Sequence, residues 1–314
     1  MSEIRIQREP RETIGLIGLG LMGSAAAKRL LSAGYPVVGF DVNADKCRAL
    51  QSLGGSPAAS PKDVAQAAQW IVLSLPDSAV VREVVEGADG IVRAAHKHRY
   101  VTDTTTGDPE ETIRLAERLA HRDIALLDAT VSGSSRQFRD GEAVLMVGGD
   151  RAAFERCTDI LAALSEKVFY LGPSGSGSKA KLAGNLVLGL NRLALAEGLV
   201  FARALGLDLE RFLELLAVSP AYSAAVDSKG RKMLDADFTP QSRIRQHHKD
   251  VALILKYAGQ AGQELPLSRV HADILEAAMA AGDGDLDNAA VIREIARRRR
   301  PSQPTNDPTE APRK

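Results

Sequence analysis

A glycine-rich turn between a short apolar run and a helix is the feature that most constrains this chain. Residues 13–41 read TIGLIGLGLMGSAAAKRLLSAGYPVVGFD. Residues 14–17 suit a buried parallel strand, the alanine-rich segment up to about Ala33 predicts a helix, and residues 37–40 predict a second strand. The GxGxxG motif lies between the first strand and the helix, in the context that binding of a dinucleotide pyrophosphate requires. The start of the chain therefore predicts a dinucleotide-binding βαβ unit.

The glycines and the acidic residue after the second strand have separate roles in such a unit. Gly18 permits the tight turn, Gly20 lets a pyrophosphate approach the backbone, and Gly23 allows close packing of helix on strand. Free N–H groups at the helix N-terminus bind the phosphate oxygens. Asp41 would accept hydrogen bonds from the ribose hydroxyls and repel a 2′-phosphate, which predicts NAD rather than NADP. The candidate cofactor residues of this unit are Gly18, Leu19, Gly20, Leu21, Met22, Gly23 and Asp41.

The alternation of strand and helix patterns continues to about residue 171. Apolar runs at 70–75, 100–103, 124–128, 143–147 and 168–171 predict strands, and segments 78–85, 109–120 and 152–164 predict helices. Repeated strand–helix pairs form a doubly wound sheet, in which ligands bind at the carboxyl ends of the strands. We therefore expect cofactor and substrate beside the short polar segments that follow Leu75, Asp103 and Asp128.

A long apolar helix is predicted after the loop GPSGSGS at residues 172–178. Helices this apolar are usually buried on all sides. Lys181 and Asn185 interrupt it and lie four residues apart, on one face. Burying an ammonium is costly unless the charge is paired. Either Lys181 extends to solvent while Asn185 binds a neighbouring backbone, or the two side chains belong to a functional site.

Strand patterns end near residue 205, and helical patterns at 208–217, 223–234, 246–261, 267–280 and 288–297 predict an all-α second domain. The predicted fold is thus an α/β Rossmann doubly wound domain followed by an all-α domain, joined by a long interdomain helix. The predicted segments are a flexible N-terminal extension (1–12), a NAD-binding Rossmann domain (13–173), the interdomain helix (174–205), the all-α C-terminal domain (206–297) and a disordered tail (298–314).

Composition narrows the class of protein. Lys+Arg and Asp+Glu both number 40, so nothing global indicates nucleic acid or an anionic membrane as a partner. Cys47 and Cys157 have neither disulfide-framework nor zinc-site spacing, and no metal site is predicted. The polar N-terminus resembles no signal peptide, and Asn, Arg and Glu interrupt the apolar helix, which argues against a membrane span. We expect a cytoplasmic protein whose arginine-rich tail is solvated.

Four segments, taken in order, resemble the β-hydroxyacid dehydrogenases, which include 3-hydroxyisobutyrate dehydrogenase, tartronate semialdehyde reductase and L-threonate dehydrogenase. They are IGLGLMG with FDVN after it, Leu75-Pro76 with DTTTGDP, DATVSGS with DG and MVGG after it, and GSGSKAKLAGN. The pair Lys249-Asp250 and the turn GDGDLD extend the resemblance, which covers about residues 13–296.

The resemblance implies a role for each matched position. Lys181 would be the catalytic lysine and Asn185 its neighbour in the active site. The substrate carboxylate would be held by Ser132, Gly133 and the backbone at Ser134, and the cofactor would be contacted by Leu75, Pro76, Thr106 and Lys249. The implied reaction is the NAD-dependent interconversion of a small 3-hydroxyacid and its semialdehyde or ketoacid. Lys181 would take up or relay the hydroxyl proton while hydride passes to the nicotinamide.

The chain also departs from the family's motifs. Gly184 replaces the first asparagine of an Asn-Asn pair, Thr130 replaces a proline, and Ser134 replaces a glycine. Phe138 is expected to narrow or cap the substrate pocket, and Arg136 is a candidate partner for a second anionic group, although a solvent-facing arginine is the simpler interpretation. These positions bear on the substrate rather than on the reaction class.

Three alternatives remain open. An imine reductase would be expected to have a residue other than lysine at position 181 and a basic residue near Val42, and a 6-phosphogluconate dehydrogenase to have a His-Asn pair in place of Gly184-Asn185. A non-catalytic dinucleotide-binding regulator would not need both Lys181 and Asn185. The apolar helix surface indicates a homo-oligomer, and the family resemblance implies a homodimer or homotetramer.

Overall fold

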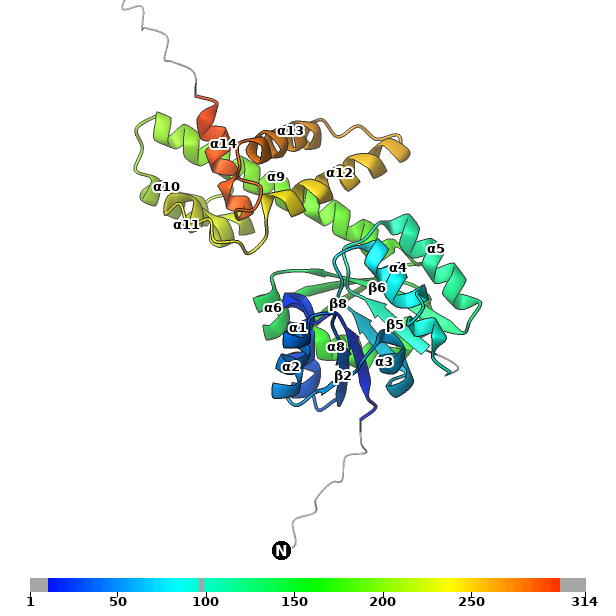
Figure 1. Cartoon of the computed structure of the whole chain (residues 1–314). Helices are drawn as coiled ribbons and strands as arrows, with labels where there is room; N and C mark the ends of the chain where they lie inside the picture. The colour runs from blue at the N-terminus through cyan, green and yellow to red at the C-terminus, as the bar shows by residue number, and fades with distance from the viewer. Residues whose placement is uncertain (1–10, 96–98, 300–314) are drawn as a thin grey trace, which may run out of the picture. The chain divides into compact units, whose positions relative to one another are not determined.

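The computed structural model describes residues 11–95 and 99–299, which divide into two compact units with the boundary between Gly184 and Asn185 (Figure 1). Each unit is described by itself below. The predicted extension (1–12) and tail (298–314) fall almost wholly outside the described residues. The boundary lies inside one helix, α9 (Ser176–Ala204), so this helix takes part in both units.

The first unit is built on one eight-stranded sheet with strand order β3-β2-β1-β4-β5-β6-β7-β8. All neighbouring strands are parallel except β6 and β7, which are antiparallel. The strands are β1 (Ile14–Ile17), β2 (Val37–Phe40), β3 (Ser56–Pro57), β4 (Trp70–Leu73), β5 (Arg99–Asp103), β6 (Ile124–Ser132), β7 (Val144–Gly148) and β8 (Lys167–Gly172). The predicted doubly wound sheet is confirmed, and the antiparallel pair was not foreseen.

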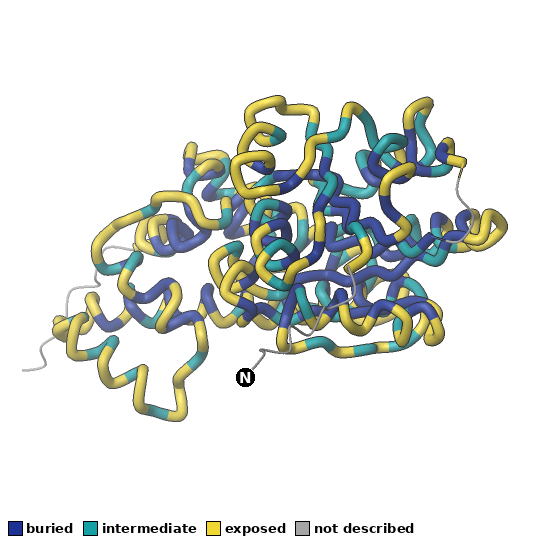
Figure 2. The backbone as a smooth tube through the Cα atoms, turned by 90° about the horizontal axis from the view of Figure 1, so that it is seen from below, coloured by how far each residue is buried: buried dark blue, intermediate teal, exposed yellow. Residues whose placement is uncertain are grey.

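Helices cover both faces of this sheet, because its inner strands are apolar on both sides (Figure 1). Along β4, Trp70 and Val72 face one hydrophobic cluster, while Ile71 and Leu73 face the other. The helices of this unit are α1 (Leu21–Ser32), α2 (Ala44–Ser52), α3 (Pro61–Ala67), α4 (Ser78–Glu86), α5 (Pro109–Ala120), α6 (Ser135–Asp140), α7 (Arg151–Arg156) and α8 (Thr158–Leu164), with a 3-10 turn η1 (Ile91–Arg93). Figure 2 shows buried residues along the extended segments and, at intervals, along the helices.

Several local predictions differ from the structure. The predicted helix at 152–164 is two helices, α7 and α8, which meet at the buried Cys157. The short elements α2, α3, α6 and β3 were not predicted. Strand β6 does not end at Asp128 but continues to Ser132, because β7 pairs with residues 128–132. Most of the polar segment 129–134, which was expected to follow this strand, is therefore part of β6.

The carboxylate of Asp128 attaches the start of α9 to the sheet. Its Oδ1 accepts a hydrogen bond from the N–H of Gly175 at 2.9 Å, and its Oδ2 accepts one from the N–H of Ser178 at 2.7 Å. A Cβ at Gly148 would lie 2.6 Å from Oδ1 of Asp128, and a Cβ at Gly177 would overlap the backbone oxygen of Asp128. Glycine at both positions is thus required for the helix to approach β6 this closely.

Helix α9 is not buried on all sides, contrary to the prediction. Val187 is 56% exposed, Leu188 42% and Phe201 63%, while Leu182, Leu195 and Leu199 are buried. The exposed positions recur every three or four residues, as they do along one face of a helix. The single chain therefore leaves an exposed stripe on α9, in which these apolar side chains lie together with the exposed Asn191 and Glu197.

The second unit is all-α, as predicted. Its elements, besides the end of α9, are α10 (Leu209–Val218), a π-helical turn η2 (Val226–Gly230), α11 (Arg231–Leu234), α12 (Ile244–Gln260), α13 (Pro266–Ala280), a 3-10 turn η3 (Asn288–Ala290) and α14 (Val291–Arg297). Its core holds several charged groups. Lys229 pairs with the fully buried Asp287 at 2.8 Å, and burial lowers the pKa of Arg192 to about 10 although Asp287 and Asp250 raise it.

We predict that Asp128→Asn destabilises the protein by about 2 kcal/mol, because Asp128 uses both carboxylate oxygens as acceptors and an amide offers only one. Asp77→Asn is the matched control. Asp77 also accepts two backbone N–H bonds, but both go to Oδ1, which an amide oxygen can replace. Urea unfolding followed by circular dichroism measures both. Equal stability of Asp128→Asn and wild type would contradict the role of Asp128.

Candidate active site

The glycine-rich turn has the geometry that its sequence predicts. Gly18 has φ +90°, and a Cβ there would overlap the backbone oxygen of Ser74. A Cβ at Gly23 would overlap the backbone oxygen of Gly18, so the first turn of α1 packs directly on the loop. A Cβ at Gly20, in contrast, would meet no protein atom within 4 Å. Of the three glycines, only Gly20 has open space at its Cβ position, where atoms of a bound molecule can lie.

The N-terminus of α1 is suited to an anion. Its N-cap residue Gly20 offers no side-chain hydrogen bond, and the first turn contains no acidic residue. Most other helices of this unit begin differently, with N–H groups that bond to a capping side chain; these caps are Asn43, Ser60, Asp77, Asp108, Ser134 and Asp150. Uncapped N–H groups and a helix dipole are what a pyrophosphate requires. The residues present therefore fit a dinucleotide, with Leu19 in the glycine-rich loop and Leu21 and Met22 in the first turn of α1.

Asp41 follows β2 and lies beside the glycine-rich turn. Its Oδ2 accepts the N–H of Leu19 at 2.8 Å, its Oδ1 accepts the N–H of Asn43 at 2.9 Å, and Lys46 Nζ lies 3.3 Å from Oδ2. The carboxylate is held at the carboxyl end of β2, next to the loop, where the ribose of a bound dinucleotide is expected.

The loops after β4 and β5 are joined by hydrogen bonds. The N–H of Leu75 donates to Oγ1 of Thr105 at 3.1 Å, and Oγ1 of Thr104 donates to the backbone oxygen of Leu73 at 2.7 Å. Pro76 and Thr106 lie in these two loops, on the strand ends that follow β1 in the sheet order. The predicted cofactor residues Leu75, Pro76 and Thr106 are thus brought to one edge of the sheet.

A pair of buried carboxylates below these loops was not among the predicted site residues. Asp103 and Asp128 are partners in the register of β5 and β6. Burial raises the pKa of Asp103 to about 6, against hydrogen bonds from Thr105, and the charge of Asp128 raises it further. Burial also raises the pKa of Asp128, against its bonds from Ser178 and Gly175. The sequence signal was available, because each aspartate ends an apolar run.

Lys181 lies beside the predicted substrate segment. Its Nζ donates to the backbone oxygen of Val131 at 2.7 Å, one residue before Ser132. Ser132 ends β6, and Gly133 follows with φ +146°. The structure therefore brings Lys181 together with the end of β6, and the lysine does not simply extend into solvent.

The residues after Gly133 modify the prediction. The N–H of Ser134 donates to Oε1 of Gln137 at 2.9 Å, and the Oγ of Ser134 accepts the N–H of Gln137, in a capping box at the start of α6. A substrate carboxylate could use the N–H of Ser134 only in competition with Gln137. The prediction for Phe138 is wrong, because this ring is fully buried in the hydrophobic core and cannot cap a pocket. Arg136 is exposed, and its Nε lies 3.7 Å from Oδ2 of Asp140, which agrees with the simpler interpretation of a solvent-facing arginine.

Asn185 lies one helical turn after Lys181 on α9, in the second unit. Its side chain is 7% exposed, and its Nδ2 donates to Oδ2 of Asp250 at 3.1 Å. An ionised carboxylate only accepts hydrogen bonds, so Asp250 fixes the orientation of the amide and leaves Oδ1 of Asn185 for other donors. Lys249, predicted to contact the cofactor, is exposed on α12. Asp250 was noted only as part of the Lys-Asp pair.

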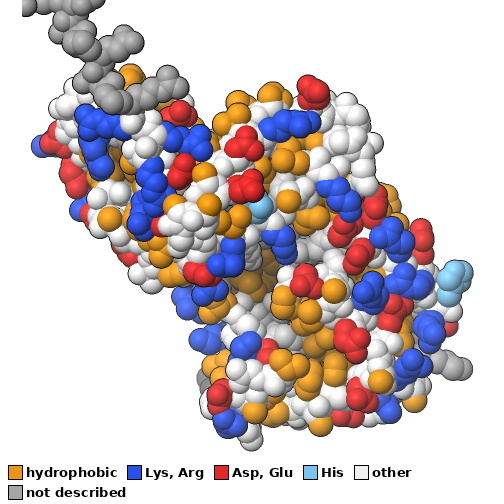
Figure 3. Space-filling view, turned by 45° about the horizontal axis from the view of Figure 1, so that its top comes forward, with side chains coloured by type: hydrophobic (Ala, Val, Ile, Leu, Met, Phe, Trp, Pro, Cys, Tyr) orange, Lys and Arg blue, Asp and Glu red, His pale blue; other side chains and the backbone are white. Residues whose placement is uncertain are grey.

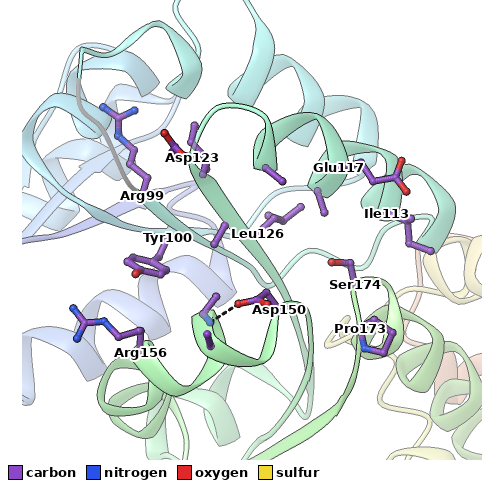
Figure 4. A pocket seen from close by; sticks show the side chains of 16 residues that line it. Arg99, Tyr100, Ile113, Glu117, Asp123, Leu126, Asp150, Arg156, Pro173 and Ser174 are labelled. Carbon is purple, nitrogen blue, oxygen red and sulfur yellow. Dashed lines mark hydrogen bonds between the residues drawn. The ribbon is translucent and has the colours of Figure 1, made fainter.

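A hollow in the first unit is separate from all of these residues. It has a volume of about 660 Å³ and lies beside β6 between α5 and α7, with Arg99, Asp123 and Arg156 toward one end and Pro173 and Ser174 toward the other (Figure 4). None of the predicted site residues lines it. Figure 3 shows basic and acidic side chains interspersed on the visible face, in keeping with the balanced composition.

Comparisons with known proteins identify the class. Residues 13–172 match the family described as the NAD binding domain of 6-phosphogluconate dehydrogenase, and residues 175–295 match the one described as NAD-binding of NADP-dependent 3-hydroxyisobutyrate dehydrogenase. The chain is thus a two-domain, NAD(P)-binding oxidoreductase of the dehydrogenase type.

Individual relatives agree with this class. The chain is 32% identical to 2-(hydroxymethyl)glutarate dehydrogenase of Eubacterium barkeri, over 89% of this chain and 93% of the relative, and 32% identical to 2-hydroxy-3-oxopropionate reductase of Escherichia coli, over 90% and 96%. The crystal structure of 3-hydroxyisobutyrate dehydrogenase from Salmonella typhimurium superposes with a TM-score of 0.83 at 29% identity, covering 90% of this chain and 99% of that one. The chain belongs to the β-hydroxyacid dehydrogenase family.

We predict that Gly20→Ala lowers the affinity for NADH at least about tenfold, because its methyl group occupies the space over the loop that the pyrophosphate needs. The same methyl group meets no protein atom, so the free energy of unfolding should change by less than about 1 kcal/mol. Calorimetric titration and urea unfolding measure the two quantities. Gly23→Ala is the contrasting variant and should lose stability. Undiminished NADH binding by Gly20→Ala would refute the loop as the phosphate site.

Proposed function

We propose that the protein is an NAD-dependent 3-hydroxyacid dehydrogenase, which interconverts a small 3-hydroxyacid and its semialdehyde or ketoacid. The contact of Lys181 Nζ with the backbone oxygen of Val131, directly before the predicted substrate segment that begins at Ser132, carries the proposal. The names of the relatives describe small hydroxy- or oxo-carboxylic acids as their substrates, which favours a small carboxylate here. The preference for NAD over NADP rests on the position of Asp41 beside the glycine-rich turn.

NAD, when bound, supplies the hydride acceptor of this reaction. In the proposed mechanism, Lys181 binds the substrate hydroxyl and accepts or relays its proton as the carbonyl forms; in the reverse direction it donates that proton. The Oδ1 atom of Asn185, which Asp250 leaves available, orients the ammonium of Lys181 or the hydroxyl. Ser132, the backbone at Gly133 and, where the capping box opens, the N–H of Ser134 bind the substrate carboxylate.

We predict that Lys181→Ala lowers kcat by roughly 10²- to 10⁴-fold, the usual contribution of a general acid–base group. NADH binding should stay close to wild type. Lys179→Ala removes an exposed lysine from the same helix and should leave kcat unchanged. The assay follows NADH formation with 3-hydroxyisobutyrate, D-glycerate, L-serine, L-threonate and 2-hydroxymethylglutarate. Near wild-type turnover by Lys181→Ala would rule out the mechanism.

We also propose a cytoplasmic homo-oligomer, a homodimer or homotetramer. Helix α9 is long and apolar enough to cross a membrane by length and composition alone, but it carries the buried polar residues Asn185 and Arg192, and its residues Leu193, Leu195, Ala196 and Leu199 belong to the hydrophobic core of the second unit. This burial favours a helix of the protein core over a helix that spans a membrane. Its exposed stripe, with Val187, Leu188 and Phe201, favours association of chains, because large apolar surfaces are usually covered.

We predict that light scattering gives a solution mass that is a multiple of the chain mass of 33.5 kDa. Val187→Lys should shift the mass toward the monomer, because the ammonium would be desolvated in a contact made by the α9 stripe. Leu53→Lys, at an exposed apolar position of the first unit, should not. A monomeric wild-type protein would contradict the proposal.

A further inference from the structure

The carboxylate of Asp41 has two kinds of partner. Two backbone N–H groups, those of Leu19 and Asn43, fix its position at 2.8 and 2.9 Å. The third partner is the ammonium of Lys46, on the first turn of α2 and 3.3 Å from Oδ2. The side chain of Asp41 is 7% exposed and that of Lys46 is 44% exposed. The acid is held rigidly, and the lysine reaches it from a solvated surface.

This pair changes how Asp41 would select a cofactor. A lone carboxylate at the ribose repels a 2′-phosphate, which carries close to two negative charges at neutral pH. An ammonium 3.3 Å away offsets much of that repulsion, and lysine is itself a phosphate-binding cation. Asp41 and Lys46 therefore act in opposite directions on a 2′-phosphate.

We infer that Lys46 is a second determinant of cofactor specificity. Its ammonium can bind a 2′-phosphate, but the ion pair with Asp41 competes with that binding. The inference rests on the proposed dinucleotide site. With Asp41 present, Lys46 gives the site a limited affinity for a 2′-phosphorylated dinucleotide. Without the charge of Asp41, Lys46 is released to bind that phosphate, and the preference moves toward NADP.

The same helix provides a matched control. Arg48 lies two residues after Lys46 and pairs with Asp45, and both side chains are exposed, at 69% and 78%. Arg48→Met removes one positive charge from α2 without touching Asp41. An effect of Lys46→Met that Arg48→Met does not share cannot come from the net charge of the helix.

The experiment is a calorimetric titration of the full-length chain with NADH and with NADPH, for wild type, Lys46→Met, Asp41→Asn, the double variant and Arg48→Met. Asp41→Asn keeps an oxygen for the N–H of Leu19 but loses the acceptor of the N–H of Asn43, so urea unfolding is measured beside the titration, and Asp41→Asn is compared with the double variant, which shares that loss. We expect Lys46→Met to weaken NADPH binding about tenfold, the loss of one charge-assisted contact, and to change NADH binding by less than about twofold. Added salt should reduce this difference.

We expect Asp41→Asn to strengthen NADPH binding about tenfold and to weaken NADH binding, and the double variant to lose the gain. The role of Lys46 would be overturned if Lys46→Met had the same ratio of NADPH to NADH dissociation constants as wild type. It would also be overturned if Arg48→Met changed this ratio as much as Lys46→Met does. Binding without turnover of any hydroxyacid would refute the proposed reaction and leave this inference intact. Failure of the wild type to bind either dinucleotide would refute both.

Discussion

The site depends on the two hydrogen bonds by which Asp128 holds the first turn of α9. The carboxylate is negative where the helix dipole is positive, and it satisfies two N–H groups that have no intrahelical partner. Its strand, β6, also provides the backbone oxygen that Lys181 contacts. Strand β6 therefore fixes both the beginning of α9 and the ammonium of Lys181. The candidate catalytic group is thus positioned by the sheet rather than by the loop before α9.

The two ends of the candidate site are prepared in different ways. Where a phosphate is expected, the protein leaves helix N–H groups free and removes a side chain at Gly20. Where a substrate is expected, polar groups are already engaged: Ser134 with Gln137, Lys181 with Val131, and Asn185 with Asp250. Groups held in this way lose little conformational freedom when they bind a small ligand. The proposed substrate is small and has few atoms to bind, so this preorganisation would matter most where it binds.

Buried charge gives the helical unit its polar interior. Lys229 is paired with Asp287, which also accepts the N–H groups of Gln241 and Ser242, and Arg192 lies in the field of Asp287 and Asp250. Such groups are costly to bury, and their pairing recovers part of that cost. Arg192 lies two turns after Asn185 on α9, and Asp250, whose charge raises the pKa of Arg192, also accepts the hydrogen bond from the amide of Asn185.

The sequence by itself determined the dinucleotide-binding unit, the helical second half, and Lys181 and Asn185 as the polar pair on an apolar helix, because these follow from local periodicity and glycine placement. Only the tertiary structure decided the rest. The antiparallel β6–β7 pair extends the strand to Ser132, Phe138 is buried rather than facing a pocket, Gln137 occupies the N–H of Ser134, and α9 keeps an exposed face. Each of these depends on contacts between segments or on which groups a side chain meets, and residue order alone does not specify them.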